Sequence, residues 1–281
     1  MSRSGIESAL DLLSNETRFE ILRSLANQQF EEPGAPGMTF SDLFAEATTD
    51  DSGNFNYHLK RLLDRLVVKA DDCYRLTHGG IQLFSLLQAT TYAPEHEYEE
   101  LTLGRRCPLC PADLTATYRE GYLEIGCEEH LVLEIYVHPS WVESLSTEEF
   151  LDRVSLLFHH HIEKIAAGIC PLCWGGLGHG LRTDEDPYPI QYHYPCSQCG
   201  TELRLLPPQT VMHRPKVEAF YRAHGVELRE TPPWELYDTF GEARVVSAEG
   251  SRVEFDFRLD GDVAVSTVDG RGNLLAFDRE R

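Results

Sequence analysis

The chain has 281 residues, of which 42% are hydrophobic, so it can build one large core or two to three ordinary ones. This composition excludes a disordered or fibrous protein. No apolar run approaches the ~18 to 20 residues that a membrane span needs, and residues 1–13 lack the layout of a signal peptide. We therefore expect a soluble, cytoplasmic protein without membrane contact.

Acidic residues outnumber basic ones by 46 to 25, which gives a formal net charge of −21. In concentrated salt, repulsion among surface carboxylates is screened over short distances, so such a charge keeps a protein soluble at little cost to compactness. The composition suggests a halophilic archaeon as the host, and an ordinary acidic protein is the alternative. Only four basic residues are lysines: Lys60, Lys69, Lys164 and Lys216.

The N-terminal segment predicts three helices separated by turns. Apolar residues recur at helical spacing in two stretches, and Asn15 can cap the second of them. A loop over residues 31–37 follows, and a short helix begins after Thr39 or Ser41. The apolar positions of the first two helices are Ile6, Leu10 and Leu13, and Phe19, Ile21, Leu22 and Leu25.

A basic helix is expected over residues 54–67, with Phe55, Leu59 and Leu62 facing the core. Between Ser52 and Lys69 four basic residues oppose one acidic residue, a local excess of +3 in a strongly negative chain. A β-hairpin over 67–77 and a last helix over 80–90 complete the segment. The acidic, proline-containing residues 93–95 are expected to form a linker.

This order of helices and hairpin is that of a winged helix-turn-helix domain. Two motifs within it resemble those of a known family. Residues 13–18 (LSNETR) and residues 57–62 (YHLKRL) resemble the opening helix and the recognition helix of ArsR-like prokaryotic repressors. The resemblance covers roughly residues 5–92. It implies a homodimer that reads a roughly palindromic DNA site. The acidic composition and the cysteine-rich remainder resemble haloarchaeal regulators that carry zinc-knuckle modules.

Two positions depart from the family. A glycine usually precedes the Leu-Val of the wing, where a left-handed residue is needed, and here Arg65 stands at that position. The metal-sensing members carry a cysteine pair on the helix before the recognition helix, whereas residues 40–45 (FSDLFA) contain no cysteine. The sequence therefore gives no support to arsenic or cadmium sensing by that route.

Seven of the eight cysteines occur in four short Cys-x-x-Cys or Cys-x-x-His pairs, which is typical of metal ligands in a reducing compartment. Two such pairs about 15 to 20 residues apart can hold one tetrahedral zinc ion. Here 16 residues separate the first two pairs and 22 the last two. The sequence predicts two structural zinc sites, formed by Cys107, Cys110, Cys127 and His130, and by Cys170, Cys173, Cys196 and Cys199.

The two zinc segments look like an internal repeat. Each opens with Cys-Pro-Leu-Cys, continues through a hairpin to the second pair, and is followed by a strand and a helix, expected over 147–167 and 215–224. The alternating residues 243–278 predict a C-terminal antiparallel β-meander. We therefore expect an α+β protein with a winged helix-turn-helix (1–92), a first zinc ribbon with its helix (93–168), and a second ribbon with helix and meander (169–281).

Other candidate groups have weaker patterns. Consecutive residues on a helix point about 100° apart, so residues 159–161 (HHH) are not expected to share one ion. His179 and His193 could supply an alternative metal ligand or pack within the second ribbon. Cys73, in the wing, could be a redox trigger or a small buried side chain.

We expect a sequence-specific DNA-binding transcription regulator and no enzyme, because closed four-ligand zinc sites leave no position for a substrate. The alternative is a zinc-stabilised module that docks a protein partner through the C-terminal region and dimerises by the winged helix. A zinc- or thiol-responsive sensor is a third hypothesis. Candidate DNA contacts are Asn54, Asn56, Tyr57 and His58 for base edges, Ser52, Lys60 and Arg61 for phosphates, and Arg75 in the wing for the backbone or minor groove.

Overall fold

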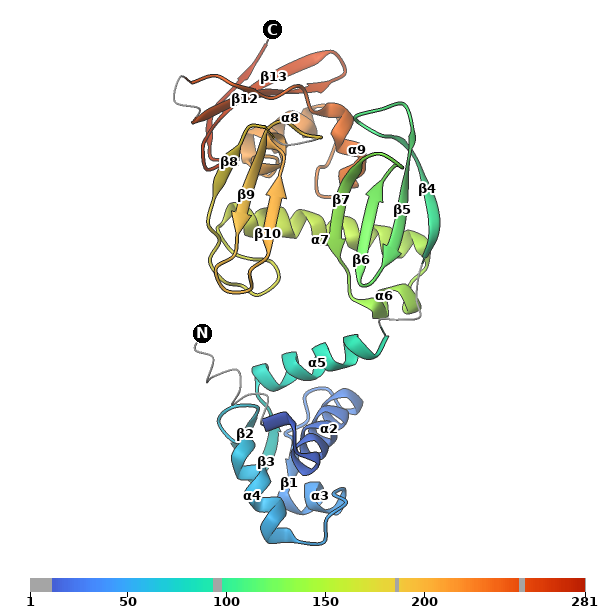
Figure 1. Cartoon of the computed structure of the whole chain (residues 1–281), viewed down its shortest axis with the longest axis vertical. Helices are drawn as coiled ribbons and strands as arrows, with labels where there is room; N and C mark the ends of the chain where they lie inside the picture. Colours follow the sequence, from blue (N-terminus) through green and yellow to red (C-terminus); the bar gives the residue numbers. More distant parts are fainter. Residues whose placement is uncertain (1–11, 93–97, 185–186, 248–250, 281) are drawn as a thin grey trace. The chain divides into compact units, whose positions relative to one another are not determined.

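The computed structural model describes residues 12–92, 98–184, 187–247 and 251–280. The chain divides into two compact units, residues 1–94 and 95–281 (Figure 1). The expected linker at 93–95 and the helical positions Ile6 and Leu10 lie outside the described residues. None of the helices that the structure describes is long and apolar enough to cross a lipid bilayer.

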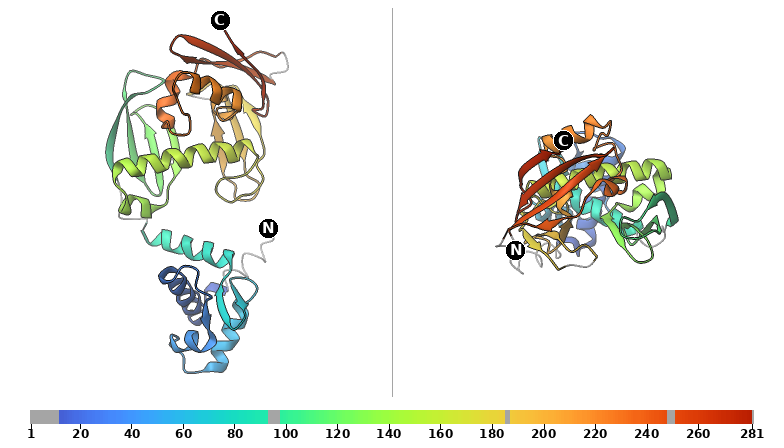
Figure 2. Two further views of the ribbon diagram at one scale, coloured as in Figure 1. Left: turned by 180° about the vertical axis from the view of Figure 1, so that it is seen from behind. Right: turned by 90° about the horizontal axis from the view of Figure 1, so that it is seen from above.

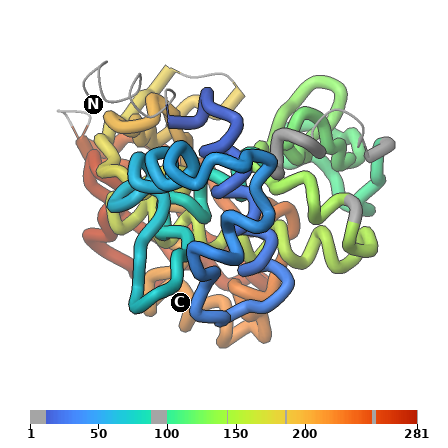
Figure 3. The backbone as a smooth tube through the Cα atoms, turned by 90° about the horizontal axis from the view of Figure 1, so that it is seen from below, coloured from blue at the N-terminus to red at the C-terminus, as the bar shows by residue number. Residues whose placement is uncertain are grey.

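The first unit contains four described helices and a small antiparallel sheet with the strand order β1-β3-β2, a winged-helix-like arrangement. Its backbone can be followed from blue to cyan in Figure 3. The elements are α2 (Glu16–Glu31), β1 (Met38–Thr39), α3 (Phe40–Ala45), α4 (Ser52–Leu62), β2 (Val67–Ala70), β3 (Cys73–Leu76) and α5 (His78–Tyr92).

Local hydrogen bonds define where these helices begin. The Asn15 side chain accepts a hydrogen bond from the Arg18 N–H and caps α2, as the sequence predicts. Thr39 and Asp42 form a reciprocal capping box at the start of α3. The helices then bury one apolar cluster that includes Ile21, Leu25, Phe55, Leu59 and Leu62.

Helix α4 is shorter at its C-terminal end than the predicted 54–67, and that prediction is corrected. The Asp51 side chain accepts hydrogen bonds from the N–H groups of Gly53 and Asn54, so the helix begins at Ser52. It ends at Leu62 because Leu63 is extended and Asp64 adopts the left-handed conformation, with φ 62°. Asp64, and not Arg65, is therefore the left-handed residue between this helix and the wing.

The second unit contains three small antiparallel sheets joined by helices. The strand orders are β4-β5-β6-β7, β10-β9-β8 and β11-β12-β13-β14. The elements are β4 (Tyr98–Arg106), β5 (Asp113–Arg119), β6 (Tyr122–Gly126), β7 (Leu131–Tyr136), α6 (Pro139–Ser144), α7 (Thr147–Ala166), β8 (Gly180–Arg182), β9 (Gln191–Pro195), β10 (Glu202–Leu205), η1 (Pro207–Thr210), α8 (Pro215–Ala223), α9 (Pro233–Leu236), η2 (Tyr237–Thr239), β11 (Arg244–Val245), β12 (Arg252–Leu259), β13 (Asp262–Asp269) and β14 (Leu274–Arg279).

Helix α7 connects the parts of this unit. It runs across both the β4–β7 sheet and the β8–β10 sheet (Figure 2). Its apolar side chains, among them Phe150, Val154 and Ile162, belong to one continuous core that also includes side chains of both sheets and of β12 and β13. The segments 93–168 and 169–281, which the sequence separates, therefore pack around shared side chains.

The expected α+β fold class is confirmed, including the C-terminal four-stranded meander. At its β12–β13 turn, Asp260 and Gly261 both have positive φ (52° and 90°), the backbone of a tight two-residue hairpin. The structure adds β4, which extends the first sheet, and α6, which begins directly at Pro139. Neither element was among the sequence predictions.

Candidate metal centres and nucleic-acid interface

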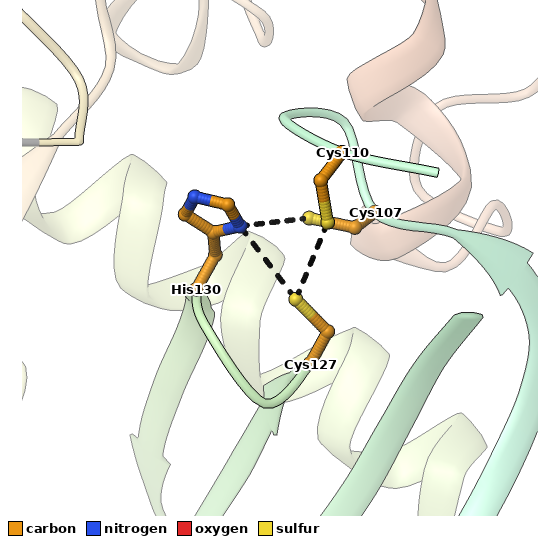
Figure 4. Close-up of side chains that lie close together, drawn as sticks. All are labelled: Cys107, Cys110, Cys127 and His130. Atoms are coloured by element: carbon orange, nitrogen blue, oxygen red, sulfur yellow. Dashed lines mark hydrogen bonds between the residues drawn. The ribbon is translucent and has the colours of Figure 1, made fainter. Parts of the chain in front are cut away.

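The first Cys/His cluster brings together two loops of the β4–β7 sheet (Figure 4). Cys107 and Cys110 precede β5, whereas Cys127 and His130 lie between β6 and β7. His130 Nδ1 lies 3.7 Å from Cys107 Sγ and 3.6 Å from Cys127 Sγ, and the Sγ atoms of Cys110 and Cys127 are 3.7 Å apart. The four donor atoms all lie within 4.8 Å of one another, so they could hold a metal ion.

The second cluster is formed in the same way by four cysteines. Cys170 and Cys173 follow α7, whereas Cys196 and Cys199 lie between β9 and β10. The Sγ atoms of Cys170 and Cys199 are 3.8 Å apart, and those of Cys173 and Cys196 are 3.5 Å apart. These four sulfur atoms also lie within 4.8 Å of one another.

Backbone hydrogen bonds shape the four ligand loops alike. The N–H of the first cysteine in each loop donates to a carbonyl three to five residues later, at 2.8 or 2.9 Å, as in Cys107 to Ala112 and Cys196 to Thr201. Gly126 precedes one loop, where a Cβ atom would approach the His130 carbonyl oxygen to 2.4 Å. Gly200 follows another with φ 79°, a left-handed conformation that glycine adopts without strain.

The observed spacings match the geometry of tetrahedral zinc. With Zn–S near 2.3 Å, two thiolates on one ion stand about 3.8 Å apart, and a thiolate and an imidazole nitrogen about 3.5 Å apart. The measured distances are 3.5 to 3.8 Å for the sulfur pairs and 3.6 to 3.7 Å for the sulfur–nitrogen pairs. Each cluster supplies a complete set of four protein ligands.

Within the second cluster, the pKa values of two thiols are shifted in opposite directions. A hydrogen bond with the Thr201 hydroxyl, 3.4 Å from Cys199 Sγ, and one with the Thr201 backbone lower the pKa of Cys199 to about 6. The Gly175 N–H favours the thiolate of Cys173, but desolvation and the neighbouring sulfur atoms together raise the pKa of Cys173 to about 12. Because neighbouring thiolates repel one another, four of them need a cation at their centre.

The remaining histidine and cysteine candidates lie outside the two metal-binding groups found among the described residues. His159 is buried and its Nδ1 lies 3.1 Å from His213 Nε2, whereas His160 is exposed, so the three consecutive histidines point in different directions. His193 is buried beside Glu202, at 3.3 Å, and His179 is exposed. Cys73 is half-buried on β3.

Helix α4 presents a polar outer face in the first unit. The side chains of Asn54, Tyr57 and Lys60 are exposed, with Tyr57 at 55%, whereas Asn56 is half-buried. His58, one of the predicted base contacts, is 9% exposed, so its side chain does not belong to this outer face. Burial, Arg18 and Arg61 lower the pKa of His58, which favours the neutral ring. The other predicted contacts Ser52, Arg61 and Arg75 are exposed.

The wing carries one cationic side chain that the sequence analysis did not select. Lys69 on β2 is exposed, lies 3.7 Å from Asp72 and stands 5.5 Å from the centre of the Tyr74 ring. The alternation of side chains along a strand does not indicate this exposure, because Lys69 lies two residues after the buried first residue of β2 and therefore on the same face. Lys69 and Arg75 are thus exposed on neighbouring strands of the wing, while Asp71 and Asp72 at its turn balance their charge.

Two family models match the chain, and neither carries a functional description. A domain of unknown function (DUF7351) matches residues 104–274, which contain both Cys/His clusters. Another domain of unknown function (DUF7347) matches residues 6–87, the helix-turn-helix segment. No curated protein and no solved structure matches the chain.

Proposed function

The chain belongs to the DUF7351 family, and on the chemistry of its two units we propose that it is a sequence-specific DNA-binding transcription regulator with two structural zinc ions. In this proposal the first unit contacts DNA and the second carries the zinc. The protein is not an enzyme, and it works in the cytoplasm, where thiols stay reduced.

The observation that carries the DNA-binding proposal is the outer face of α4. A helix of this kind reads the major groove with exposed amide and phenol side chains, while cations beside them contact phosphates. Here Asn54 and Tyr57 are exposed beside Lys60 and Arg61. The opposite face is fixed to the core by residues such as Phe55, so the outer face is held in one orientation.

The wing supports the same proposal. Arg75 and Lys69 are exposed on its two strands, where a winged helix touches the DNA backbone or the minor groove. Resemblance to ArsR-like regulators adds a homodimer and a site with dyad symmetry. At molar salt little affinity comes from counterion release, so base contacts and DNA shape supply a larger share of the binding free energy.

Zinc has a structural role in this proposal. The first ion would be held by three cysteines and a histidine, the second by four cysteines, with no coordination position left for water or substrate. The ions would join loops that are distant in sequence, at the ends of two small sheets.

The proposal is tested by selecting fragments of host DNA on the zinc-loaded full chain in molar potassium chloride and sequencing what is retained. A discrete motif with dyad symmetry near promoters is expected. The variant Asn54→Ala, Tyr57→Ala, which alters only exposed side chains, should lose this enrichment while keeping its fold. Retention of no specific sequence by folded, zinc-replete protein would contradict the proposal.

A second function, docking of a protein partner by the second unit, is favoured by apolar side chains on the ligand loops. Leu109 and Leu172 occupy equivalent positions in the two Cys-Pro-Leu-Cys loops and are 38% and 45% exposed. Trp174 is 63% exposed and holds a positive φ of 62°, which is uncommon for a bulky residue. A partner that co-purifies with the full chain and is lost in Leu172→Ser, Trp174→Ser would establish this function. The zinc content and DNA retention of that variant should stay unchanged.

A further inference from the structure

Two hollows adjoin each other in the second unit, where the C-terminal end of α7, the second ribbon, the start of α8 and the β13–β14 turn meet. One has a volume of about 260 Å³ and is lined by residues including Tyr194, Thr210 and Arg271. The other has a volume of about 420 Å³ and is lined by residues including Lys216. Arg214 and Asn273 line both, so the two form one site, which we call the α8 hollow.

The α8 hollow gathers positive charge in a negative part of the molecule. Residues 93–281 contain 33 acidic and 17 basic groups. Many arginines of this unit are paired with carboxylates, as Arg229 is with Glu163 at 2.6 Å. Arg214, Lys216 and Arg271 all line the hollow, and the structure shows no ion pair for any of them within the described residues. Three cations for which the described part of the chain shows no ion pair therefore line one hollow in an acidic unit.

Asp269, the last residue of β13, lies close enough to Arg271 to interact with its charge, but its oxygens accept hydrogen bonds from the turn and form no ion pair with the three cations. Asp269 accepts hydrogen bonds from the Arg271 N–H at 2.8 Å, the Asn273 N–H at 2.9 Å and the Asn273 side-chain amide at 3.0 Å. Desolvation opposes ionisation of Asp269, but these hydrogen bonds and the positive charge of Arg271 together lower its pKa. Asp269 thus fixes the conformation of the turn that carries Arg271.

The same turn is fixed from the ribbon side. The Tyr192 hydroxyl donates to the Asp269 carbonyl at 2.7 Å. Gly272 has φ 82°, and a Cβ atom there would come within 2.8 Å of the Tyr194 hydroxyl and 3.0 Å of Thr210 Cβ, so the turn lies tightly against both side chains. A cation presented on a braced turn loses less conformational freedom when it binds a ligand.

We propose that the α8 hollow is a binding site for a small organic anion that carries a phosphate or carboxylate group. Arg214 and Arg271 suit such a group because a guanidinium can bind two of its oxygens at once, and Lys216 adds a point charge. The Asn273 amide supplies a polar contact, and Tyr194 and Leu274 supply an apolar wall for the body of the ligand. The larger hollow, of about 420 Å³, falls within the size range of small-molecule sites. This inference goes beyond the proposed function and does not depend on DNA binding.

The test is isothermal titration of the zinc-loaded full chain with three probes: inorganic phosphate, adenosine 5′-monophosphate and citrate. At least one probe should bind saturably. The variant Arg214→Gln, Arg271→Gln should weaken that binding tenfold or more. The matched control Arg119→Gln, Arg252→Gln removes the same charge from exposed positions on β5 and β12 that line neither hollow, and it should change the affinity less than twofold.

The probes separate the two chemistries. Binding of phosphate or the nucleotide without citrate supports a phosphorylated ligand, and binding of citrate alone supports a polycarboxylate. Absence of saturable binding by all three probes would overturn the inference. Equal weakening of probe binding in the hollow variant and the control variant would also overturn it. That result would show that the probes respond to the overall charge of the protein and not to this site. Thermal unfolding followed by tryptophan fluorescence verifies that both variants keep the fold of the wild-type chain.

Discussion

The first unit places Phe55, Leu59 and Leu62 in one apolar cluster enclosed by helices and a three-stranded sheet. The second unit spreads a larger core over three sheets of short strands, and two of these sheets end in a Cys/His cluster. Small sheets with short strands bury too little apolar surface to be stable alone. The comparison teaches that one unit can be stabilised by its side-chain core, whereas the other needs both a shared helix and, in our proposal, metal.

Loss of zinc should have the largest of the expected effects, because it should destabilise the second unit and leave the first unit folded. Structural zinc contributes on the order of 10 kcal/mol of apparent binding free energy at a site. Cys196→Ser should lower the zinc content from two ions to one per chain and unfold much of the second unit. All three tryptophans, Trp141, Trp174 and Trp234, lie in that unit, so their fluorescence reports its unfolding.

The matched control is Cys73→Ser, which alters a cysteine outside both clusters. It should keep two zinc ions per chain and the tryptophan emission of the wild type. If Cys196→Ser retained two zinc ions and its native emission, the structural role of the second cluster would be wrong.

A core substitution in the first unit should destabilise that unit and leave the second unit unchanged. The Phe55 ring packs edge-on against Phe40 and Phe44, at centroid distances of 5.6 and 5.3 Å. Phe55→Ala should destabilise the first unit by about 3 to 5 kcal/mol, the usual cost of a large cavity. Amide hydrogen exchange over α2 and α4 should accelerate while zinc content and tryptophan emission stay constant. A parallel loss of zinc would show that the two units do not fold separately.

Substitutions on the outer face of α4 test whether the first unit binds DNA through base contacts or through phosphate contacts. In molar salt, Asn54→Ala should weaken specific binding by about 1 to 3 kcal/mol, because its exposed amide is placed to contact a base edge. Lys60→Ala should weaken it less, because a phosphate contact contributes little affinity when counterion release is small. Fluorescence anisotropy with the selected DNA measures both variants. Equal losses, or a larger loss for Lys60→Ala, would contradict the base-contact assignment.

Acid should affect the second unit through a buried histidine pair, with the smallest of the expected effects. Burial lowers the pKa of His159 and, with His159 beside it, lowers the pKa of His213 to about 4. Between pH 6.5 and about 4 the unfolded chain therefore takes up protons that the folded unit does not. Stability should fall as the pH falls through this window, by at most about 1.4 kcal/mol per pH unit for each buried ring.

Urea unfolding at pH 7.5 and 5.5, followed by tryptophan fluorescence, measures this dependence. His213→Gln should show a smaller loss between the two pH values than the wild type. His160→Gln, which alters the exposed neighbour of His159, should follow the wild type. The same loss in all three proteins would assign the acid sensitivity to other groups.

The sequence predicts the metal clusters well because their chemistry is local. A Cys-x-x-Cys pair brings two ligands together in one turn, and only the pairing of turns depends on the fold. The end of α4 was harder, because it depends on the backbone of Leu63 and Asp64 and on no change in apolar spacing. The burial of His58 was missed although helical spacing indicates it: His58 lies three residues after Phe55 and four before Leu62, on the face that these apolar side chains turn to the core.

The shared core of the second unit could not be predicted from sequence patterns. It depends on contacts between distant segments, such as the hydrogen bond from the Tyr237 hydroxyl to the Val132 carbonyl at 3.1 Å and that from Tyr192 to Asp269. Periodicity assigns residues to helices and strands but contains no information on which sheets meet. The α8 hollow has the same origin, because its cations come from two segments more than fifty residues apart.

The most direct test of the central claim is hydrogen–deuterium exchange of the zinc-loaded full chain with and without the selected DNA. The account predicts protection over α4 and over the wing strands β2 and β3, with exchange unchanged at the Cys/His clusters and the α8 hollow. Protection confined to the second unit would contradict the claim that the first unit binds DNA.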